Sequence, residues 1–525
     1  MPYETSPEID FSAIGLVVDV PANAVPTGGW SNSLNVRAKN DSVQGVNAFA
    51  NDIVLHPTDS NIANGEAKAI CQFTPAGGDN LVIAYIVKGV NGNGSVVLYD
   101  TGGSGNSRWN DVTNATADQV FTFDDDYPPQ IFVFNELLIV NPATDAPPQF
   151  TNASVGAGSL AELPNWINDS SSQPIICRVL KGFNTRLIAM NVKEEHGVGG
   201  AGTADDADDD VYQPIDLLFS STITTIASLA AAQWTASSTN TAGDAFLNDT
   251  PGKILDGGQL GEFFIAYKSD SVVRIRETGD SFVLAIESIF EDDGIYSTRC
   301  FANIGNSQHL VVGNYGVYIH DGQSQKQDIA KDLFKDTIYA LVKPAERNRA
   351  FVFQQTRDKE VWFCLPSTSN STTGCDIAFC YDYDSTKIHK RSLPGITDLF
   401  ETELNGELKI FGTKSGTTLQ TLSNTVLEAN GFFERTDDNL TNNSIMKHIN
   451  RIHVTAKGAC KLAITGTKNL SDSKSYTDIA FNPATDYKVD TRTSGRFMNL
   501  RVTMNGATNP ELTKLQFDIK VIGVR

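Results

Sequence analysis

The stretch Gly313-Asn314-Tyr315-Gly316-Val317-Tyr318-Ile319-His320-Asp321-Gly322 decides the fold class of this 525-residue chain. It follows the short apolar run at residues 309–312, so two strand-like segments flank a polar turn, and this pattern predicts a β-hairpin. We expect residues 314–316 to supply the positive φ that a tight turn needs. The hairpin contains no chemical motif, so it indicates architecture rather than a reaction.

Similar units of strand, polar turn and strand recur along the chain, at residues 81–99, 131–140, 263–276, 350–365 and 400–412. The hairpins are spaced at roughly 40 to 50 residues, with one much longer gap after Val140, and each must bury one face against a neighbour, as propeller blades or stacked sandwich sheets do. No unit carries a Trp-Asp consensus, so both architectures stay open. The predicted class is mainly β, built from repeated hairpins, with one helix expected at residues 328–342.

Three regions are predicted. Residues 1–70 form an extended N-terminal arm with the first strands. Residues 71–429 hold the propeller-like repeats, with loop insertions near 194–214. Residues 430–525 alternate apolar and polar side chains and form a small antiparallel β domain.

The arm combines prolines with a turn and a strand. Pro21 and Pro26 favour extended backbone and cannot donate ladder hydrogen bonds, so we expect this segment to wrap over a surface. We therefore predict an interface arm that wraps a neighbouring surface, with Asp19, Pro21, Pro26, Trp30 and Arg37.

The formal charge of −21, from 62 acidic and 41 basic residues, argues against a protein that grips nucleic acid through phosphates. It suits a wall that DNA passes without sticking, and it also suits simple solubility. Asp124-Asp125-Asp126 is interpreted as a charged turn before a strand. A second acidic group, which we interpret as a solvated loop rather than a calcium site, consists of Asp205, Asp206, Asp208, Asp209 and Asp210.

Seven cysteines, an odd number without a CxxC pair, predict free thiols in a reducing compartment. The N-terminus has no signal-peptide pattern, and no apolar run approaches the roughly 18 residues that span a bilayer. We therefore expect no membrane insertion.

No motif of a hydrolase, metalloprotease, nucleotide-binding loop or dinucleotide fold is present, and the seven histidines lack ligand spacing. We predict no catalytic, cofactor-binding or metal site, and no enzyme activity. Trp109, Trp166, Trp234 and Trp362 would stack on sugars if exposed, but we favour a role in the core.

Three segments carry a resemblance to a known family. They are Asp19-Val20-Pro21 with residues 26–37, the Gly313 to Gly322 stretch with residues 328–332, and Gly495-Arg496-Phe497. In this order they resemble the tail nozzle proteins of short-tailed bacteriophages, also called tail tubular protein B or tail stabilisation proteins. The resemblance spans nearly the whole chain through short motifs.

The resemblance implies a structural virion protein of a podovirus tail, assembled in the host cytoplasm. It implies a homohexamer below a tail adaptor protein, with a tail fibre or tailspike attached, and transient passage of viral double-stranded DNA during ejection. In such a ring we expect the arm at residues 19–37 to contact the adaptor or the neighbouring subunit, and the acidic loop at residues 205–210 to lie at the lumen or tip. An alternative from another class is a propeller-based tail component that binds or cleaves host glycan.

Overall fold

The computed structural model describes residues 3–524 except 76–79, 114–119, 153–158, 167–174, 195–211, 280–282, 306, 332, 405, 441–443 and 505–509. Five consecutive stretches of chain each fold into a separate four-stranded antiparallel sheet, and we call these sheets blades 1 to 5. Successive strands of a blade are neighbours, so short turns are enough to connect them.

Blade 1 comprises β9 (Glu66–Phe73), β10 (Val82–Lys88), β11 (Gly94–Asp100) and β12 (Trp109–Asp111), and blade 2 comprises β13 (Gln130–Phe134), β14 (Leu137–Asn141), β15 (Gln149–Thr151) and β16 (Ala161–Glu162). Blade 3 comprises β17 (Ile175–Phe183), β18 (Arg186–Glu194), β19 (Gln213–Phe219) and β20 (Gly243–Phe246), and blade 4 comprises β21 (Ile254–Leu260), β22 (Phe263–Lys268), β23 (Val272–Glu277) and β24 (Leu284–Phe290). Blade 5 comprises β25 (Phe301–Ile304), β26 (Gln308–Val312), β27 (Val317–His320) and β28 (Lys326–Asp328).

The next sheet is larger because one long strand, β32 (Ile388–Leu404), belongs to two blades. Its first half pairs with β31 (Cys375–Asp382), and its second half pairs with β33 (Glu407–Lys414). The change falls at Gly395, which has a φ of +77° that a glycine adopts without strain. Blade 6 therefore comprises β29 (Phe351–Gln355), β30 (Glu360–Leu365), β31 and the start of β32.

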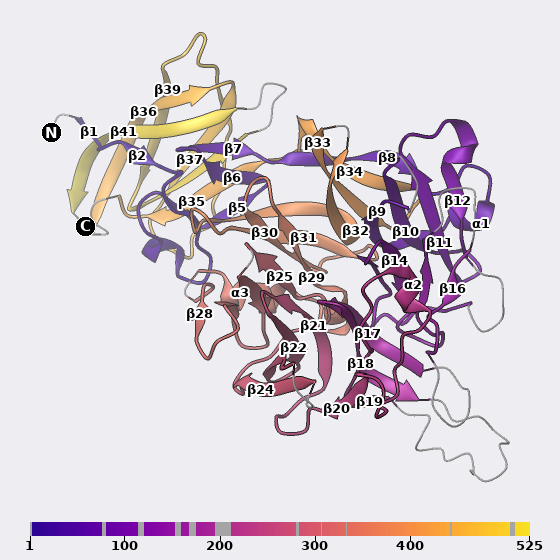
Figure 1. Cartoon of the computed structure of the whole chain (residues 1–525). Helices are drawn as coiled ribbons and strands as arrows, with labels where there is room; N and C mark the ends of the chain where they lie inside the picture. Colours follow the sequence, from indigo (N-terminus) through magenta and orange to yellow (C-terminus); the bar gives the residue numbers. More distant parts are fainter. Residues whose placement is uncertain are drawn as a thin grey trace.

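Blade 7 closes the ring with a strand from the other end of the chain. Its strands are the end of β32, then β33, β34 (Thr418–Leu427) and β8 (Asn47–Val54), and β8 pairs with β34. After β8 the chain passes through α1 (Ser60–Ala63) into β9, the first strand of blade 1, and β9 lies against β32. Figure 1 shows the blades arranged around a centre, with β8 beside β34. The seven blades form a closed propeller.

A β-sandwich at one side of the propeller is built from both ends of the chain (Figure 1). Its two sheets share one apolar core that includes Phe433, Leu462, Leu500 and Leu515. One sheet contains β39 (Lys488–Gly495), β36 (Ile445–Lys457), β41 (Glu511–Val524), β7 (Ser42–Gly45), β6 (Val36–Lys39), β1 (Glu4–Thr5) and β2 (Ile9–Asp10), and the other contains β38 (Ile479–Phe481), β37 (Cys460–Thr467), β40 (Phe497–Thr503), β35 (Phe432–Asp438) and β5 (Asn32–Leu34).

The predicted class, mainly β with repeated hairpins, is confirmed, and the propeller is the architecture that the hairpins build. The boundaries differ from the predicted ones. Residues 1–45 belong largely to the C-terminal sandwich, while the propeller starts at β8 rather than near residue 71. Such pairings join segments some 400 residues apart, and no local pattern in the sequence reports them.

Two local expectations need correction. The turn between β26 and β27 does not use positive φ at residues 314–316; the Gly313 N–H donates to the Gly316 carbonyl instead. The expected helix at residues 328–342 is only α3 (Lys335–Leu341), because Asp328 still pairs with Tyr318 in β28. A second short helix, α2 (Ile226–Leu229), is capped by Thr225.

Ring closure by β8 generates a stability prediction. Ile53 is buried in a core shared by blades 7 and 1, whereas its neighbour Val54 is 41% exposed. We expect Ile53→Ala to lower the free energy of unfolding by about 3 kcal/mol, because it leaves a cavity in that core. Val54→Ala is the matched control, with a change within about 0.5 kcal/mol. Urea unfolding followed by tryptophan fluorescence measures both, and equal effects would contradict this account of β8.

Candidate functional site

Charged side chains from four blades meet at the propeller axis. Lys181 Nζ of β17 lies 3.1 Å from Asp256 Oδ1 of β21. The other oxygen of Asp256 accepts the backbone N–H of Arg299, just before β25, at 2.7 Å. The Arg299 guanidinium is 3.4 Å from Asp398 of β32. These bonds tie blades 3, 4, 5 and 7 together across the axis.

Blade 1 joins the same network through its backbone. Asp398 accepts the N–H of Ile70, and Thr397 Oγ1 donates to the carbonyl of Ala67 at 2.7 Å. Burial raises the pKa of Asp398, although Arg299 lies beside it. The free space beside this network is about 40 Å³, enough for only a few water molecules, since each needs ~10–15 Å³ of such space. Ion pairs therefore fill the axis.

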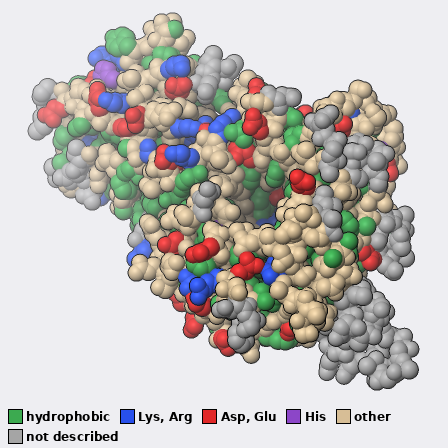
Figure 2. All heavy atoms as spheres, in the orientation of Figure 1, with side chains coloured by type: hydrophobic (Ala, Val, Ile, Leu, Met, Phe, Trp, Pro, Cys, Tyr) green, Lys and Arg blue, Asp and Glu red, His purple; other side chains and the backbone are tan. Residues whose placement is uncertain are grey.

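A groove with three connected parts surrounds the axial network. A pocket of about 500 Å³ contains Lys88, Arg178, Lys193 and Tyr212, and one of about 390 Å³ contains Lys253, Tyr296, Thr298 and Arg347. The small axial space lies between them and contains Lys68, Arg299 and Arg349. We call this the axial groove. Figure 2 shows the surface hollowed over the middle of the propeller.

The charge of the axial groove differs from that of the chain. Eight basic side chains line it, against six acidic ones, while the chain as a whole carries −21. The basic residues are Lys68, Lys88, Arg178, Lys193, Lys253, Arg299, Arg347 and Arg349, and the acidic ones are Glu66, Asp124, Asp125, Asp126, Asp145 and Asp270. The groove is thus a locally basic region of an acidic protein.

Aromatic rings hold two of the guanidinium groups in the groove. Arg178 lies over the rings of Tyr127 and Tyr212, at 4.5 and 3.9 Å from their centroids, and Arg347 lies 4.4 Å over Tyr296. Stacking on a ring fixes the plane of a guanidinium while its N–H groups still point to acceptors. The groove therefore presents oriented donors.

The sequence analysis did not find this site. Lys181, Asp256, Arg299 and Asp398 are isolated charges in apolar segments, each at or just before the first strand of a blade. The pattern that could have revealed the site is the recurrence of a charged residue at or just before the first strand of a blade, because the first strands of consecutive blades meet at the axis. The Asp124 to Asp126 segment does precede a strand as predicted, because β13 begins at Gln130.

Three of the five predicted arm residues have side chains that contact other parts of the same chain. The Asp19 carboxylate accepts the N–H groups of Asp336 and Thr337 at the start of α3. Trp30 is fully buried, and Arg37 pairs with Asp358 and Glu360. Pro21 and Pro26 are exposed. A contact between this segment and another protein stays a prediction. The predicted loop with Asp205, Asp206, Asp208, Asp209 and Asp210 lies outside the described residues.

The tryptophans occupy the core, as favoured from the sequence. Trp166, Trp234 and Trp362 are each at most 3% exposed, and Trp109 donates its indole N–H to the Val54 carbonyl. Stacking of sugars on these three buried rings is therefore ruled out. All seven cysteines are free and buried, in agreement with the predicted free thiols. No helix in the described part of the chain is long and apolar enough to cross a membrane.

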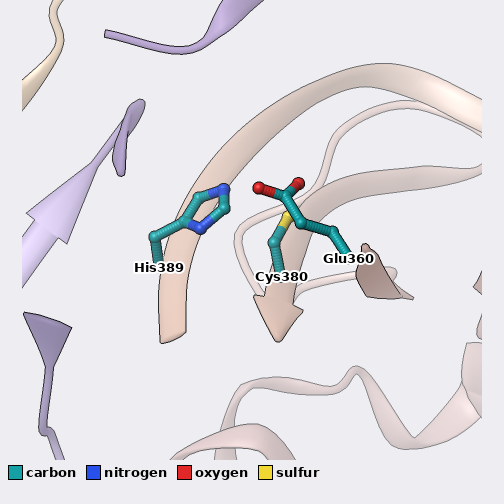
Figure 3. Close-up of side chains that lie close together, drawn as sticks. All are labelled: Glu360, Cys380 and His389. Carbon is teal, nitrogen blue, oxygen red and sulfur yellow. The ribbon is translucent and has the colours of Figure 1, made fainter. Parts of the chain in front are cut away.

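One buried cluster contains possible metal ligands. Glu360, Cys380 and His389 come from the neighbouring strands β30, β31 and β32 and point toward one another, with ligand atoms within 4.8 Å (Figure 3). Both Glu360 oxygens already accept hydrogen bonds, from Arg37 at 3.3 Å and Trp362 at 2.8 Å. With its carboxylate held by a cation and an indole, the set does not fit a metal ion.

The same cluster cannot reach a substrate, because Glu360 and His389 are 4% exposed and Cys380 is fully buried. Burial lowers the pKa of His389 to about 4 and raises that of Cys380, so both are neutral near pH 7. We interpret the cluster as the polar contact by which Arg37 of β6 attaches the sandwich to blade 6.

A second buried network joins blades 4 and 5. The Gly322 N–H donates to His320 Nδ1, so the proton of this imidazole is on Nε2, which donates to Tyr267 Oη at 2.7 Å. Tyr267 in turn donates to His309 Nδ1 at 2.7 Å, and His309 Nε2 donates to the Gln259 carbonyl. Every polar hydrogen of the chain from His320 to Gln259 has an acceptor.

Comparisons with known proteins add little. No protein-family model matches the chain, and no curated protein matches it. Among solved structures, it is similar to the WD40 domain of Pan2 from Neurospora crassa, with a TM-score of 0.38 and 8% identity over 72% of this chain and 97% of that domain. A similarity of this size does not bear on function, and the propeller assignment follows from the strand order.

Two histidines of the blade 4 to blade 5 network make stability depend on pH. Burial lowers the pKa of His309 to about 4 and that of His320 to about 3, with Lys326 and His309 adding to the effect on His320, while Gln259 and Asp256 oppose it at His309. Because the unfolded chain binds these protons near pH 6.5, stability is complete above that pH and falls as the pH drops toward 3. We expect a loss of about 3 kcal/mol for each histidine.

Urea unfolding at intervals between pH 7.5 and 4 measures this dependence. The double substitution His309→Asn and His320→Gln should make the profile shallower, with a residual slope from the buried His389, and His448→Gln, in a partly exposed histidine, should leave it unchanged. A profile equally steep in the double variant would assign the acid sensitivity to other groups.

The Arg37 contact gives a separate prediction. Burial favours protonated Asp358, but Arg37 and Lys39 hold the pKa of this carboxyl well below its usual range. Arg37→Met would leave two buried carboxylates short of a cation, and we expect unfolding to become easier by about 3 kcal/mol. Arg357→Met, which removes a more exposed arginine 3.8 Å from Asp358, is the control, with an effect below about 1 kcal/mol. Similar losses in both variants would contradict the assigned role of Arg37.

Proposed function

We propose that this chain is a structural protein of a phage tail, a nozzle whose copies form a ring-shaped conduit for genome retention and ejection. The observation that carries the proposal is where the family-like segments lie. Asp19 of the first segment bonds to residues 336 and 337, directly after the second segment. The backbone N–H groups of Val18 and Asp19 also donate to the Leu333 carbonyl.

The other family-like positions lie at close packing contacts. Trp30 stacks on Phe433 of the sandwich with ring centroids 5.2 Å apart. Gly495 has no room for a side chain, since a Cβ there would lie 2.7 Å from the backbone of Gly466. The first segment therefore contacts both α3 and the sandwich, and Gly495 packs on β37 within the sandwich, which supports an architectural role for these segments.

The filled axis constrains where DNA would pass. A space of about 40 Å³ among ion pairs cannot admit a duplex, so the conduit of the proposed nozzle lies between copies of the chain, around a shared axis. The net charge of −21 supports this arrangement, because an acidic wall repels the phosphates that it surrounds. In a cyclic ring each copy uses two different patches of its surface.

Cryo-electron microscopy of the native particle that contains this chain tests the proposal. We expect a ring of copies with an axial hole bounded by the outer surfaces of several propellers. A propeller mounted at the periphery without a through-channel would contradict the nozzle. Release of reducing sugar from host polysaccharide by the purified chain would favour the glycan-directed alternative instead.

A further inference from the structure

The connection between blades 1 and 2 crosses the axial groove. We call residues 121–127 the strap, because both of its ends are fastened. At one end Phe121 is fully buried, and its carbonyl accepts the Gly94 N–H. At the other, Tyr127 is 9% exposed and is followed by Pro128 and Pro129, which favour extended backbone.

Between these ends, three successive carboxylates are held by groups from other blades. Asp124 pairs with Arg178 of blade 3 at 3.0 Å, and Asp125 pairs with Arg349, just before blade 6, at 2.8 Å. Asp126 accepts the side-chain N–H of Asn348 at 2.6 Å. Blades 2 and 6 lie on different sides of the ring, so the strap spans the axial opening.

Thr122 and Phe123 fix the start of the strap, through hydrogen bonds from Thr122 to Asp145 and packing of Phe123 on Phe121, whereas the carboxylates that follow make partly exposed contacts. The side chains of Asp124 and Asp125 are 34% and 64% exposed, and solvated ion pairs of this kind contribute little. Burial would raise the pKa of Asp125, but the hydrogen bond and charge of Arg349 lower it, so this carboxylate is ionised near neutral pH. An incoming ligand with similar groups can therefore compete for these partners.

The groove also contains polar atoms that the strap leaves unused. Thr298 is 3% exposed and lines the 390 Å³ pocket, and its Oγ1 makes no hydrogen bond to the described residues. Arg299 Nε, beside the axial space, likewise has no partner in that part of the chain. Buried polar groups are usually satisfied, so two such atoms in one groove indicate a site for a ligand.

We propose that the axial groove is a docking site for an acidic segment of a partner protein, and that the strap occupies it in cis. The strap itself shows what the groove accepts: a peptide with successive carboxylates. Apart from the strap's own carboxylates, the lining contains three acidic side chains, Glu66, Asp145 and Asp270, and each of these repels the phosphates of a nucleic acid, whose charge is uniform. A peptide, by contrast, offers amide N–H groups to those acids and carboxylates to the arginines. The inference does not depend on the proposed conduit.

Removal of the strap's charges tests the proposal with the full chain. Asp124→Asn, Asp125→Asn and Asp126→Asn together release Arg178 and Arg349 without deleting backbone. The control replaces Asp292, Asp384 and Asp490 by Asn, which removes three exposed, ion-paired carboxylates that do not line the groove. Both variants change the net charge by the same amount.

Fluorescence anisotropy with a fluorescein-labelled hexa-aspartate peptide gives the readout. We expect the strap variant to bind at least tenfold more tightly than the unchanged chain and the control variant, with affinity that falls as salt rises. Adding Arg349→Gln to the strap variant should remove the gain. A hexa-asparagine peptide should bind none of the proteins.

Equal affinities in the strap and control variants, with circular dichroism and melting temperatures unchanged, would overturn the proposal. So would tighter binding of a labelled hexameric oligodeoxynucleotide than of the acidic peptide, because the groove would then be a general anion site. If the strap variant does not fold, the single variant Asp125→Asn, matched to Asp384→Asn, replaces it. For this pair of variants we expect at least a threefold gain in affinity for the hexa-aspartate peptide, and a smaller gain overturns the proposal.

Discussion

Pairing of β8 with β34 is the constraint on which the rest of the structure depends. A propeller of antiparallel sheets is stable only when its first and last blades are joined, because an open ring leaves two sheet faces and a strand edge unpaired. Here residues 47–54 supply the outermost strand of blade 7 and then lead directly into blade 1. The residues before them are consequently held beside the last blades.

That placement explains why the N-terminal residues form no separate arm. Once β8 is fixed in blade 7, the preceding strands β5, β6 and β7 lie where the chain emerges from blade 7 into the C-terminal region. They complete both sheets of the sandwich, and β1 and β2 pair with β41. The N-terminal segment from Asp19 to Arg37 thereby couples the propeller and the sandwich. Asp19, Trp30 and Arg37 each bond or pack across the junction.

Closure also forces charge into the centre. First strands of all blades converge there, and the polar positions at their beginnings have no water to face except at the groove. A buried charge is tolerated only with a partner of opposite sign. The charged residues at the axis therefore pair between blades, and these are Lys181, Asp256, Arg299 and Asp398. Toward solvent the basic residues outnumber the acids, and the strap lies over them. The result is a basic groove in a strongly acidic chain.

Many of the strands and turns could be predicted from the sequence, because alternation of apolar and polar residues and turn residues such as Asn135-Glu136 act within a few positions; both residues of that turn adopt positive φ. The strands of blade 3, at residues 175–246, were not among them. The sequence also predicted buried tryptophans and free thiols. Only the tertiary structure decided the number of blades, the division of β32 at Gly395, the sharing of the sandwich by both chain ends and the axial groove. Each of these depends on contacts between residues tens to hundreds of positions apart, and a single sequence carries no local signal of which distant charges or strands will meet.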